Sequence, residues 1–357
     1  MAEISSFNTL FVEKLLVWYD RNKRNLPWRD TVDPYKVWIS EIILQQTRVD
    51  QGLPYYHNFL KTFPKLQNLA EADEQKVLSI WQGLGYYSRA RNMHQGAKQI
   101  REQYKNKFPT SYEEWLKIKG VGSYTAAALA SFCSKEAVPV LDGNVFRVLS
   151  RIFGISEDIL SGKGKKVFWD KALELIPKDK PDLFNQAMME YGALQCTPKS
   201  PDCEQCVFQN HCFAFNKSLI SALPFKNKKL VRRSRFFEYQ VYLYKKKVLF
   251  KTRFKGDIWE GLNEFPLIEK LSKEDLVKST SKTKHVFQSE IYKHVLSHQD
   301  LYCIFKVHEV KTLKDWESLI KKNQAEPIAL NKIAAVPKPV LISKFLNTYF
   351  NDYFSTQ

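Results

Sequence analysis

Four of the six cysteines of this chain lie between residues 196 and 212, and four thiols on one short loop can hold a metal centre. They follow the spacing C-x6-C-x2-C-x5-C, at positions Cys196, Cys203, Cys206 and Cys212. Zinc sites usually pair two CxxC motifs across a longer gap, whereas this loop contains one CxxC. A compact loop of four thiolates suits a [4Fe-4S] cluster, in which each iron binds one cysteine. Zinc is the alternative that the spacing leaves open.

A glycine pair between two helical patterns predicts a binding site for phosphate. Gly120 and Gly122 flank Val121 in the stretch 116–132. Glycine permits a positive φ angle and a close approach of the backbone. The helix that follows would begin with free N–H groups and the positive end of its dipole. A tight turn between two helices with no ligand is the alternative.

Two acidic residues stand in settings that would give their carboxyl groups different roles. Glu41 has apolar neighbours, so burial would raise its pKa and keep it protonated as a general acid. The pattern alone favours the alternative, an exposed position at the edge of the helix. Asp142 follows an apolar run and precedes a helical pattern, where it would cap the helix and stay ionised at the positive end of the dipole. Such a pair can protonate a leaving group and stabilise a positive charge.

The cysteine loop and the glycine turn resemble those of the endonuclease III superfamily of DNA glycosylases. The stretch "PYKVWISEIILQQTRV" around Glu41 resembles the adenine DNA glycosylase (MutY) family within it. The resemblance covers nearly the whole chain and is most specific over residues 26–212. It implies an all-α N-terminal domain of two helical lobes with a helix-hairpin-helix motif and one [4Fe-4S] cluster. It also implies an α+β C-terminal domain that is similar to MutT and the Nudix proteins.

The resemblance assigns catalytic roles to four residues. Glu41 would protonate the departing adenine, and Asp142 would stabilise the cationic sugar with Asn144 as its polar partner. In the lyases of the superfamily, the residue that matches Tyr124 is a lysine that forms a Schiff base. A phenol cannot form an imine, so we expect base removal without an obligatory lyase step.

Further residues match positions that contact substrate in the family. Arg29 and Glu190 resemble residues of the adenine pocket. Gln46 and Thr47 resemble a tip that enters the duplex when the adenine leaves the stack. Tyr86 resembles a residue that stacks near the opposite base. The predicted contacts to the DNA backbone are Gly120, Gly122 and Lys199.

The second half of the chain resembles the domain that recognises 8-oxoguanine opposite adenine in this family. It lacks a Nudix box, G-x5-E-x7-R-E, so pyrophosphate hydrolysis is not expected. Ser297 could hydrogen-bond the damaged base, although Leu296 replaces the phenylalanine that usually precedes it. Glu260 and Asn263 also depart from the family, which commonly has glycine and tryptophan there. An ordinary strand pair with no base contact is the alternative.

Periodicity divides the chain at the same place. Apolar residues recur every three or four positions up to about residue 215, with turn signals between the segments. A basic stretch at residues 226–235 reads as a charged linker that could touch phosphate. Strands are predicted at 237–244, 247–253 and 294–310, and helices at 272–279 and 337–350. We therefore predict domains at residues 1–217 and 236–350, joined by a linker at 218–235.

Composition limits the partners and the location. The chain of 357 residues carries 55 Lys and Arg against 38 Asp and Glu, a net charge of +17, which favours a polyanionic partner. It has no apolar run that could span a membrane, and we expect no targeting segment at its start. We predict a bacterial cytoplasmic monomer that joins the nucleoid when bound to DNA.

The predicted reaction is hydrolysis of the N-glycosidic bond of adenine mispaired with 8-oxoguanine or guanine in double-stranded DNA, after base flipping. One alternative is a glycosylase for another mismatch, such as thymine opposite guanine, against which Glu41 argues. The other is a cluster-bearing DNA-binding protein without activity. The presence of both Glu41 and Asp142 disfavours it, because binding alone requires neither carboxyl group.

Overall fold

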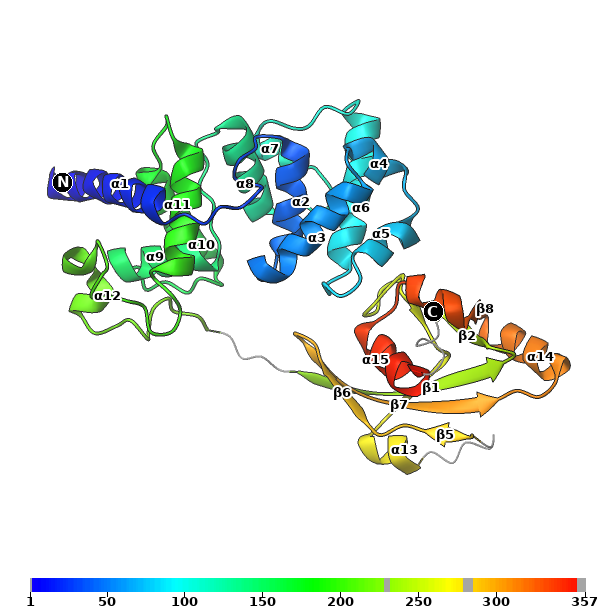
Figure 1. Ribbon diagram of the computed structural model, residues 1–357. Coiled ribbons are helices and arrows are strands. Elements are labelled where there is room, and N and C mark those ends of the chain that lie inside the picture. The colour runs from blue at the N-terminus through cyan, green and yellow to red at the C-terminus, as the bar shows by residue number, and fades with distance from the viewer. Residues whose placement is uncertain (1, 228–231, 279–284, 352–357) are drawn as a thin grey trace. The chain divides into compact units, whose positions relative to one another are not determined.

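The computed structural model describes residues 2–227, 232–278 and 285–351, and the contacts within it divide the chain into two compact units (Figure 1). Unit 1 comprises Met1–Glu71 and Asn92–Lys228, and unit 2 comprises Ala72–Arg91 and Lys229–Gln357. Within the described residues, no helix combines the length and the apolarity needed to cross a membrane. Residues 228–231 of the predicted linker lie outside the described residues.

The regular elements of unit 1 are all helices within its described residues, as predicted. Its elements are α1 (Ala2–Asn22), α2 (Pro34–Leu44), α3 (Val49–Thr62), α4 (Leu66–Glu71), most of α6 (Ser88–Gln103), α7 (Tyr112–Trp115), α8 (Ser123–Ser134), α9 (Gly143–Phe153), α10 (Gly162–Leu175), α11 (Pro181–Leu194), η1 (Gln209–His211) and α12 (Phe213–Asn216). In Figure 1 they form two groups, with α2, α3 and α8 in one and α1 and α9 to α12 in the other.

Local signals explain where the helices of the site begin. Asp33 caps α2 by accepting a hydrogen bond from the backbone N–H of Tyr35, and Pro34 occupies the first turn, where its missing N–H is not needed. Most residues of α2 are buried, so the helix lies inside unit 1. The second group packs around a core of large side chains that includes Phe11, Phe168 and Tyr191.

The glycine turn precedes α8, although the helix before it is short. Gly120 has a φ of +83°, and a Cβ there would lie 2.6 Å from the Cβ of Asn92. Only glycine suits this position. Gly122 is the N-cap of α8 and is exposed. The turn is therefore a tight connection that leaves the start of α8 open to solvent.

Unit 2 is built on a mixed sheet and confirms the predicted α+β character. Its strands are β1 (Arg233–Tyr244), β2 (Lys247–Thr252), β3 (Asn263–Glu264), β4 (Leu267–Lys270), β5 (Phe287–Gln288), β6 (Tyr292–Val295), β7 (Gln299–Glu309) and β8 (Glu326–Ala329). The main order is β3-β2-β1-β7-β5, with β1 and β7 parallel and the other pairs antiparallel. Its helical elements are α5 (Glu74–Ile80), α13 (Lys273–Lys278), α14 (Leu313–Asn323), η2 (Leu330–Ala335) and α15 (Val340–Tyr349).

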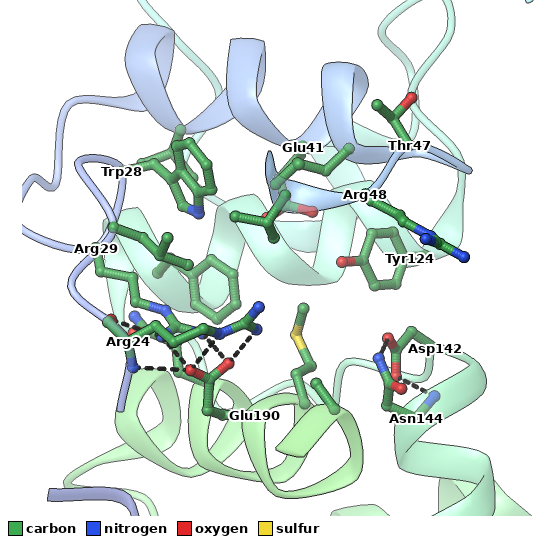
Figure 2. A pocket seen from close by; sticks show the side chains of 18 of the residues that line it. Arg24, Trp28, Arg29, Glu41, Thr47, Arg48, Tyr124, Asp142, Asn144 and Glu190 are labelled. Carbon is green, nitrogen blue, oxygen red and sulfur yellow. Dashed lines mark hydrogen bonds and ion pairs between the residues drawn. The ribbon is translucent and has the colours of Figure 1, made fainter. Parts of the chain in front are cut away.

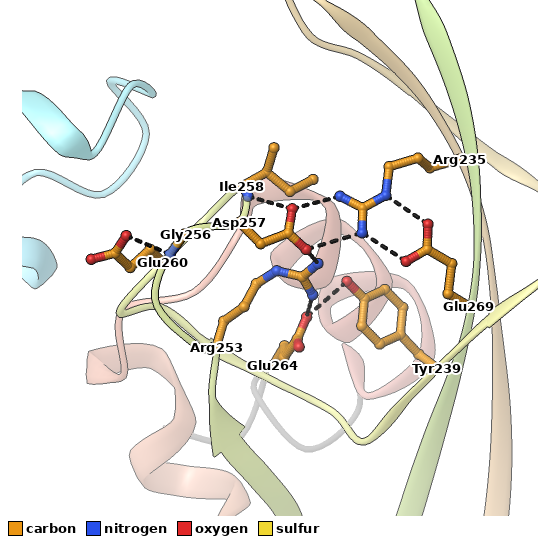
Figure 3. A network of polar contacts seen from close by, with 9 residues as sticks. All are labelled: Arg235, Tyr239, Arg253, Gly256, Asp257, Ile258, Glu260, Glu264 and Glu269. Atoms are coloured by element: carbon orange, nitrogen blue, oxygen red, sulfur yellow. Dashed lines mark hydrogen bonds and ion pairs between the residues drawn. The ribbon is translucent and has the colours of Figure 1, made fainter.

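A network of ion pairs lies inside unit 2 and includes a residue of the predicted basic linker (Figure 3). Arg235 belongs to β1 and is buried, and its guanidinium pairs with Asp257 at 2.6 Å and with Glu269 at 2.7 Å. Arg253 pairs with Asp257 and with the buried Glu264. The charge of Arg235 is thus neutralised inside unit 2. The prediction that the whole basic stretch 226–235 could touch phosphate is therefore wrong for Arg235.

Candidate active site and cluster loop

A cavity of about 600 Å³ lies in unit 1 between α2, the segment before it, α8, the start of α9 and α11 (Figure 2). Seven of the predicted site residues line it, although they come from positions far apart in the sequence. They are Arg29, Glu41, Thr47, Tyr124, Asp142, Asn144 and Glu190. The structure therefore brings both candidate carboxyl groups to one cavity.

Glu41 is buried on α2, with 6% of its surface exposed, so the alternative of an exposed helix edge is wrong. Burial raises the pKa of its carboxyl group to about 7. The negative charge of Asp142 raises this pKa further, while hydrogen bonding from Tyr124 and the positive charge of Arg29 oppose the rise. Near neutral pH a large fraction of Glu41 is protonated, as a general acid requires.

Tyr124 is the second residue of α8, and its hydroxyl points toward Glu41 in Figure 2. Burial raises the pKa of this phenol well above its usual range, and the charges of Glu41 and Asp142 add to the effect. The hydroxyl therefore keeps its proton and can donate it in a hydrogen bond to the Glu41 carboxylate. The Tyr124 side chain therefore positions the Glu41 carboxyl group, and it has no amine that could form a Schiff base.

Asp142 caps α9, as the sequence predicts. One carboxylate oxygen accepts hydrogen bonds from the backbone N–H groups of Asn144 at 2.9 Å and Val145 at 2.8 Å. The other accepts from the side-chain amide of Asn144 at 2.7 Å. Burial raises the pKa of Asp142 despite these hydrogen bonds, which act in the opposite direction. The expected effect of the helix start is therefore present, but it is smaller than that of burial.

Glu190 lines another side of the cavity and forms ion pairs with two arginines (Figure 2). Arg24 contacts its carboxylate at 2.6 Å and Arg29 at 2.7 Å, and each guanidinium reaches both oxygens. Burial alone would raise the pKa of Glu190, but these hydrogen bonds outweigh it and hold the pKa at about 2. Glu190 is therefore ionised and keeps its charge near neutral pH, unlike Glu41 in the same cavity, which readily takes a proton.

Arg147 joins this cavity to the cysteine loop. Its guanidinium donates to the backbone carbonyls of Cys196 and Gly192, both at 2.6 Å, and to the side-chain oxygen of Asn144 at 2.8 Å. Asn144 in turn donates to Asp142. Gly192 permits this approach, because a Cβ there would lie 2.6 Å from that of Asn144. The position of Asp142 thus depends on contacts that begin at the first cysteine of the loop.

The surroundings of the cysteines suit thiolate ligands. Arg151 is buried, with its guanidinium 3.6 Å from the sulfur of Cys196, and the Tyr191 hydroxyl lies 2.9 Å from the sulfur of Cys206. Burial raises the pKa of the Cys196 thiol, while the charges of Arg151 and Arg147 lower it. No three His, Cys, Asp or Glu side chains in the described part of the chain surround a single metal ion. A [4Fe-4S] cluster does not require such a group, because each thiolate binds a separate iron.

Other predicted residues lie away from the cavity. Gln46 is exposed in the turn after α2 with a φ of 57°, and Lys199 is exposed on the cysteine loop. Tyr86 and Ser297 belong to unit 2, where Ser297 is exposed in the turn between β6 and β7. Sequence reasoning missed Arg24, since nothing near it in sequence indicates its partner Glu190, which lies 166 residues further along the chain.

Two family models match unit 1. One is described as the HhH-GPD superfamily base excision DNA repair protein and matches residues 39–177. The other is described as the iron-sulfur binding domain of endonuclease III and matches residues 196–212, the segment that contains the four cysteines. The chain therefore binds a [4Fe-4S] cluster through this loop.

One of two similar proteins extends the match to nearly the whole chain. The adenine DNA glycosylase of Buchnera aphidicola subsp. Schizaphis graminum is 33% identical over 339 residues, covering 93% of this chain and 96% of that protein. The human adenine DNA glycosylase is 42% identical over 230 residues, covering 60% of this chain and 42% of that protein.

Solved structures match over about three fifths of the chain. A thermostable thymine-DNA glycosylase matches with a TM-score of 0.54 and 27% identity, over 59% of this chain and 97% of that one. Endonuclease III in a non-covalent DNA complex matches with a TM-score of 0.53 and 17% identity, over 60% of this chain and 98% of that one. The second likeness concerns the fold alone.

Proposed function

Because this chain belongs to the adenine DNA glycosylases, we propose that it excises adenine mispaired with 8-oxoguanine or guanine from double-stranded DNA. The chain is a DNA glycosylase, a hydrolase of base excision repair. One observation carries the proposal beyond the family name: a buried glutamate with a pKa of about 7 shares a cavity with a helix-capping aspartate. An acid and a charge stabiliser at one site are what the hydrolysis of a glycosidic bond needs.

Adenine would enter the cavity after leaving the base stack. A flipped base needs apolar surface against its faces and polar groups at its edge. Leu26, Trp28 and Met189 supply the first, and the group formed by Glu190, Arg24 and Arg29 supplies the second. Because the two arginines share one carboxylate, the group is held in place before any base arrives.

Hydrolysis would then proceed in two steps. Glu41 gives its proton to the adenine, at N7 as the family resemblance implies, and the bond between the base and C1′ breaks with its electron pair going to the base. Asp142 stabilises the positive charge that develops on the sugar. Water adds to C1′ and releases a proton to a carboxylate of the site. The products are free adenine and an abasic site, which Tyr124 cannot attack as an amine would.

The cluster has a structural part in this proposal. When bound, it would cross-link the loop through Cys196, Cys203, Cys206 and Cys212, the ligands that we assign to it. The fixed loop would present Lys199 to a phosphate and would hold the carbonyl of Cys196 for Arg147. The support for this part is the contact from Arg147 through Asn144 to Asp142.

The remaining predicted site residues of unit 1 would bind the duplex on either side of the mispair. Gly120 and Gly122 with the open start of α8 would seat a phosphate, and Gln46 and Thr47 would fill the gap that the adenine leaves. Gln45 supports that tip, because its side-chain amide donates to Thr125 of α8 at 3.1 Å.

Unit 2 would act as the MutT-like domain that recognises 8-oxoguanine, with Ser297 as its contact. Tyr86, also in unit 2, would stack near the base opposite the adenine. The net charge of +17 supports binding to DNA. We propose that a single chain binds chromosomal DNA in a bacterial cytoplasm.

The test is single-turnover base release from labelled duplexes that contain adenine opposite 8-oxoguanine or guanine, or thymine opposite guanine. The wild type should release adenine, and Glu41→Gln should lose at least 10²-fold in rate. Glu102→Gln, an exposed site on α6, is the matched control and should keep the rate. Release of thymine would favour the mismatch activity named for the similar thymine-DNA glycosylase. Tight binding with no base release by the wild type would contradict an enzyme.

A further inference from the structure

The loop between β2 and β3 is held rigid by its own contacts, all within unit 2 (Figure 3). Arg253 pairs with Asp257 at 2.6 Å, and the backbone N–H of Gly256 donates to the carboxylate of Glu260 at 3.0 Å. The N–H of Gly261 donates back to the carbonyl of Arg253 at 3.1 Å. A loop with these internal bonds can position whatever it touches.

The end of this loop contacts α5 through one side chain. Gln75 donates from its amide nitrogen to the carbonyl of Gly261 at 3.0 Å, and its amide oxygen accepts from the side chain of Asn263 at 3.1 Å. The backbone of Asn263 is fixed in turn, because its N–H donates to the carbonyl of Pro337 at 2.9 Å. Gly261 has a φ of +77°, and a Cβ there would lie 3.4 Å from Leu78 of α5.

The neighbouring residue of the loop contacts the first turn of α6. Arg91 donates a hydrogen bond to the carbonyl of Glu260, and its guanidinium lies 3.6 Å from the Glu260 carboxylate. Only 16% of the side chain of Arg91 is exposed. Residues 260–263 therefore contact α5, through Gln75, and the first turn of α6, through Arg91. These two helices flank residues 81–87.

Those intervening residues present Tyr86 to solvent. Its side chain is 44% exposed, and its φ is +46°, a strained value for a residue with a side chain. Arg89 lies over the rings of both Trp81, at 5.2 Å, and Tyr86, at 5.6 Å, and the indole of Trp81 donates to the carbonyl of Gly85 at 3.1 Å. The orientation of Tyr86 thus depends on where α5 and α6 hold the two ends of its segment.

We propose that Glu260 and Asn263 are positioning residues for Tyr86 and thereby help to set the specificity for the base opposite the adenine. The inference rests on the function proposed above, in which Tyr86 lies near that base. These two are also the positions at which the sequence departs from the glycine and tryptophan common in the resembled family. A glycine at position 260 would have no carboxylate for Arg91. A tryptophan at position 263 would have no acceptor oxygen, whereas the side-chain oxygen of Asn263 accepts a hydrogen bond from the Thr252 hydroxyl at 3.3 Å.

The test compares single-turnover rates on adenine opposite 8-oxoguanine with rates on adenine opposite guanine. Asn263→Ala and Gln75→Ala should each lower the ratio of the two rates by about three- to tenfold, as the loss of hydrogen bonds predicts. Their double variant should lose no more than the larger single loss, because both changes remove the same contact. The rate on adenine opposite guanine should stay within about twofold of wild type.

Arg101→Ala is the matched control for an Arg91→Ala variant, since Arg101 also lies on α6 and pairs with an acid, Glu71, at 3.1 Å. Arg91→Ala should lower the ratio and Arg101→Ala should not. A wild-type ratio in all variants, or an equal loss on both substrates, would overturn the inference. If Asn263→Ala does not fold, Gln75→Ala tests the other side of the same contact. Absence of base release by the wild type would instead overturn the proposed function, and this inference with it.

Discussion

Buried charge is used in opposite ways in the cavity of unit 1 and in the ion-pair network of unit 2. In unit 2, Glu264 and Asp257 each accept from a guanidinium, and the hydrogen bonds of Arg235 and the charge of Arg253 overcome burial to hold the pKa of Asp257 at about 2. In unit 1, Glu41 has no ion pair among the described residues, and burial raises its pKa to about 7.

Ion pairing, and neither burial nor the direction of the pKa shift, distinguishes Glu264 in unit 2 from Glu41 in unit 1. Glu264 is also buried, and burial raises its pKa even though Arg253 acts against the rise. Its carboxylate nevertheless lies 2.5 Å from the guanidinium of Arg253. Glu264 lines neither of two cavities found among the described residues, so no substrate could reach it there. A buried carboxyl group that lies beside a cavity and forms no ion pair is placed for proton transfer, whereas one that is paired holds the fold together.

The largest effect should come from Asp142→Asn. Asparagine keeps the cap of α9 but removes the negative charge that would stabilise the sugar. We expect base release to slow on the order of 10³-fold in single turnover while binding to the duplex changes little. Glu264→Gln in unit 2 is the contrasting variant and should keep the rate within about threefold of wild type. A similar loss of rate in both would erase the distinction between the regions.

Glu264→Ala should have the largest effect on stability. It leaves the guanidinium of Arg253, which is 1% exposed, without one of its partners inside the protein. Breaking a buried pair from one side costs roughly 3–5 kcal/mol in the free energy of unfolding. Denaturant unfolding followed by fluorescence measures it, with Glu174→Ala, an exposed site, as control. A loss below about 1 kcal/mol would show that the network does not hold the fold.

Glu190→Gln should weaken catalysis by about 10- to 100-fold, because Arg24 and Arg29 would lose the charge that they share. Since the pKa of Glu190 is about 2, its own ionisation adds no pH dependence between pH 5 and pH 9. Single-turnover rates at several pH values test both statements. A rate unchanged by the substitution would remove Glu190 from the pocket that binds adenine.

The smallest effect should be a gain in stability from Glu41→Gln. Because the pKa of Glu41 is raised from 4.5 to about 7, the folded state binds more protons than the unfolded state between these values. The wild type therefore loses stability as pH rises from about 4.5 to about 7, and the loss is complete above pH 7. Glutamine cannot ionise, so the variant should be more stable by roughly 1–3 kcal/mol at pH 8 and by little at pH 4. Equal stability at pH 8 would contradict a raised pKa.

The sequence predicted those parts of the site that local patterns encode. Asp142 before an apolar-periodic segment indicates a helix cap. For Glu41 the pattern alone favours an exposed helix edge, and its role as a buried acid is expected from the resemblance. Long-range pairs leave no such pattern. Arg235 stands in a basic run that resembles a solvated linker, and its partners Asp257 and Glu269 follow 22 and 34 residues later.

The fold shows the same division. Long strands with alternating side chains, β1 and β7, were predicted and are confirmed. The short strands β3, β4, β5 and β8 were missed, because two to four residues carry no recognisable alternation. Helix α14 was missed as well, although Thr312 accepts a hydrogen bond from the N–H of Asp315 at its start and gives a local signal that could have found it.

The pH dependence of single-turnover adenine release, measured for the wild type beside Glu41→Gln, tests the central claim most directly. If Glu41 is the acid, the wild-type rate should be highest below pH 7 and should fall tenfold per pH unit well above it, because the protonated form disappears. The residual rate of Glu41→Gln should show no such fall. A wild-type rate that stays level from pH 6 to pH 9 would contradict the assignment of Glu41 as the proton donor.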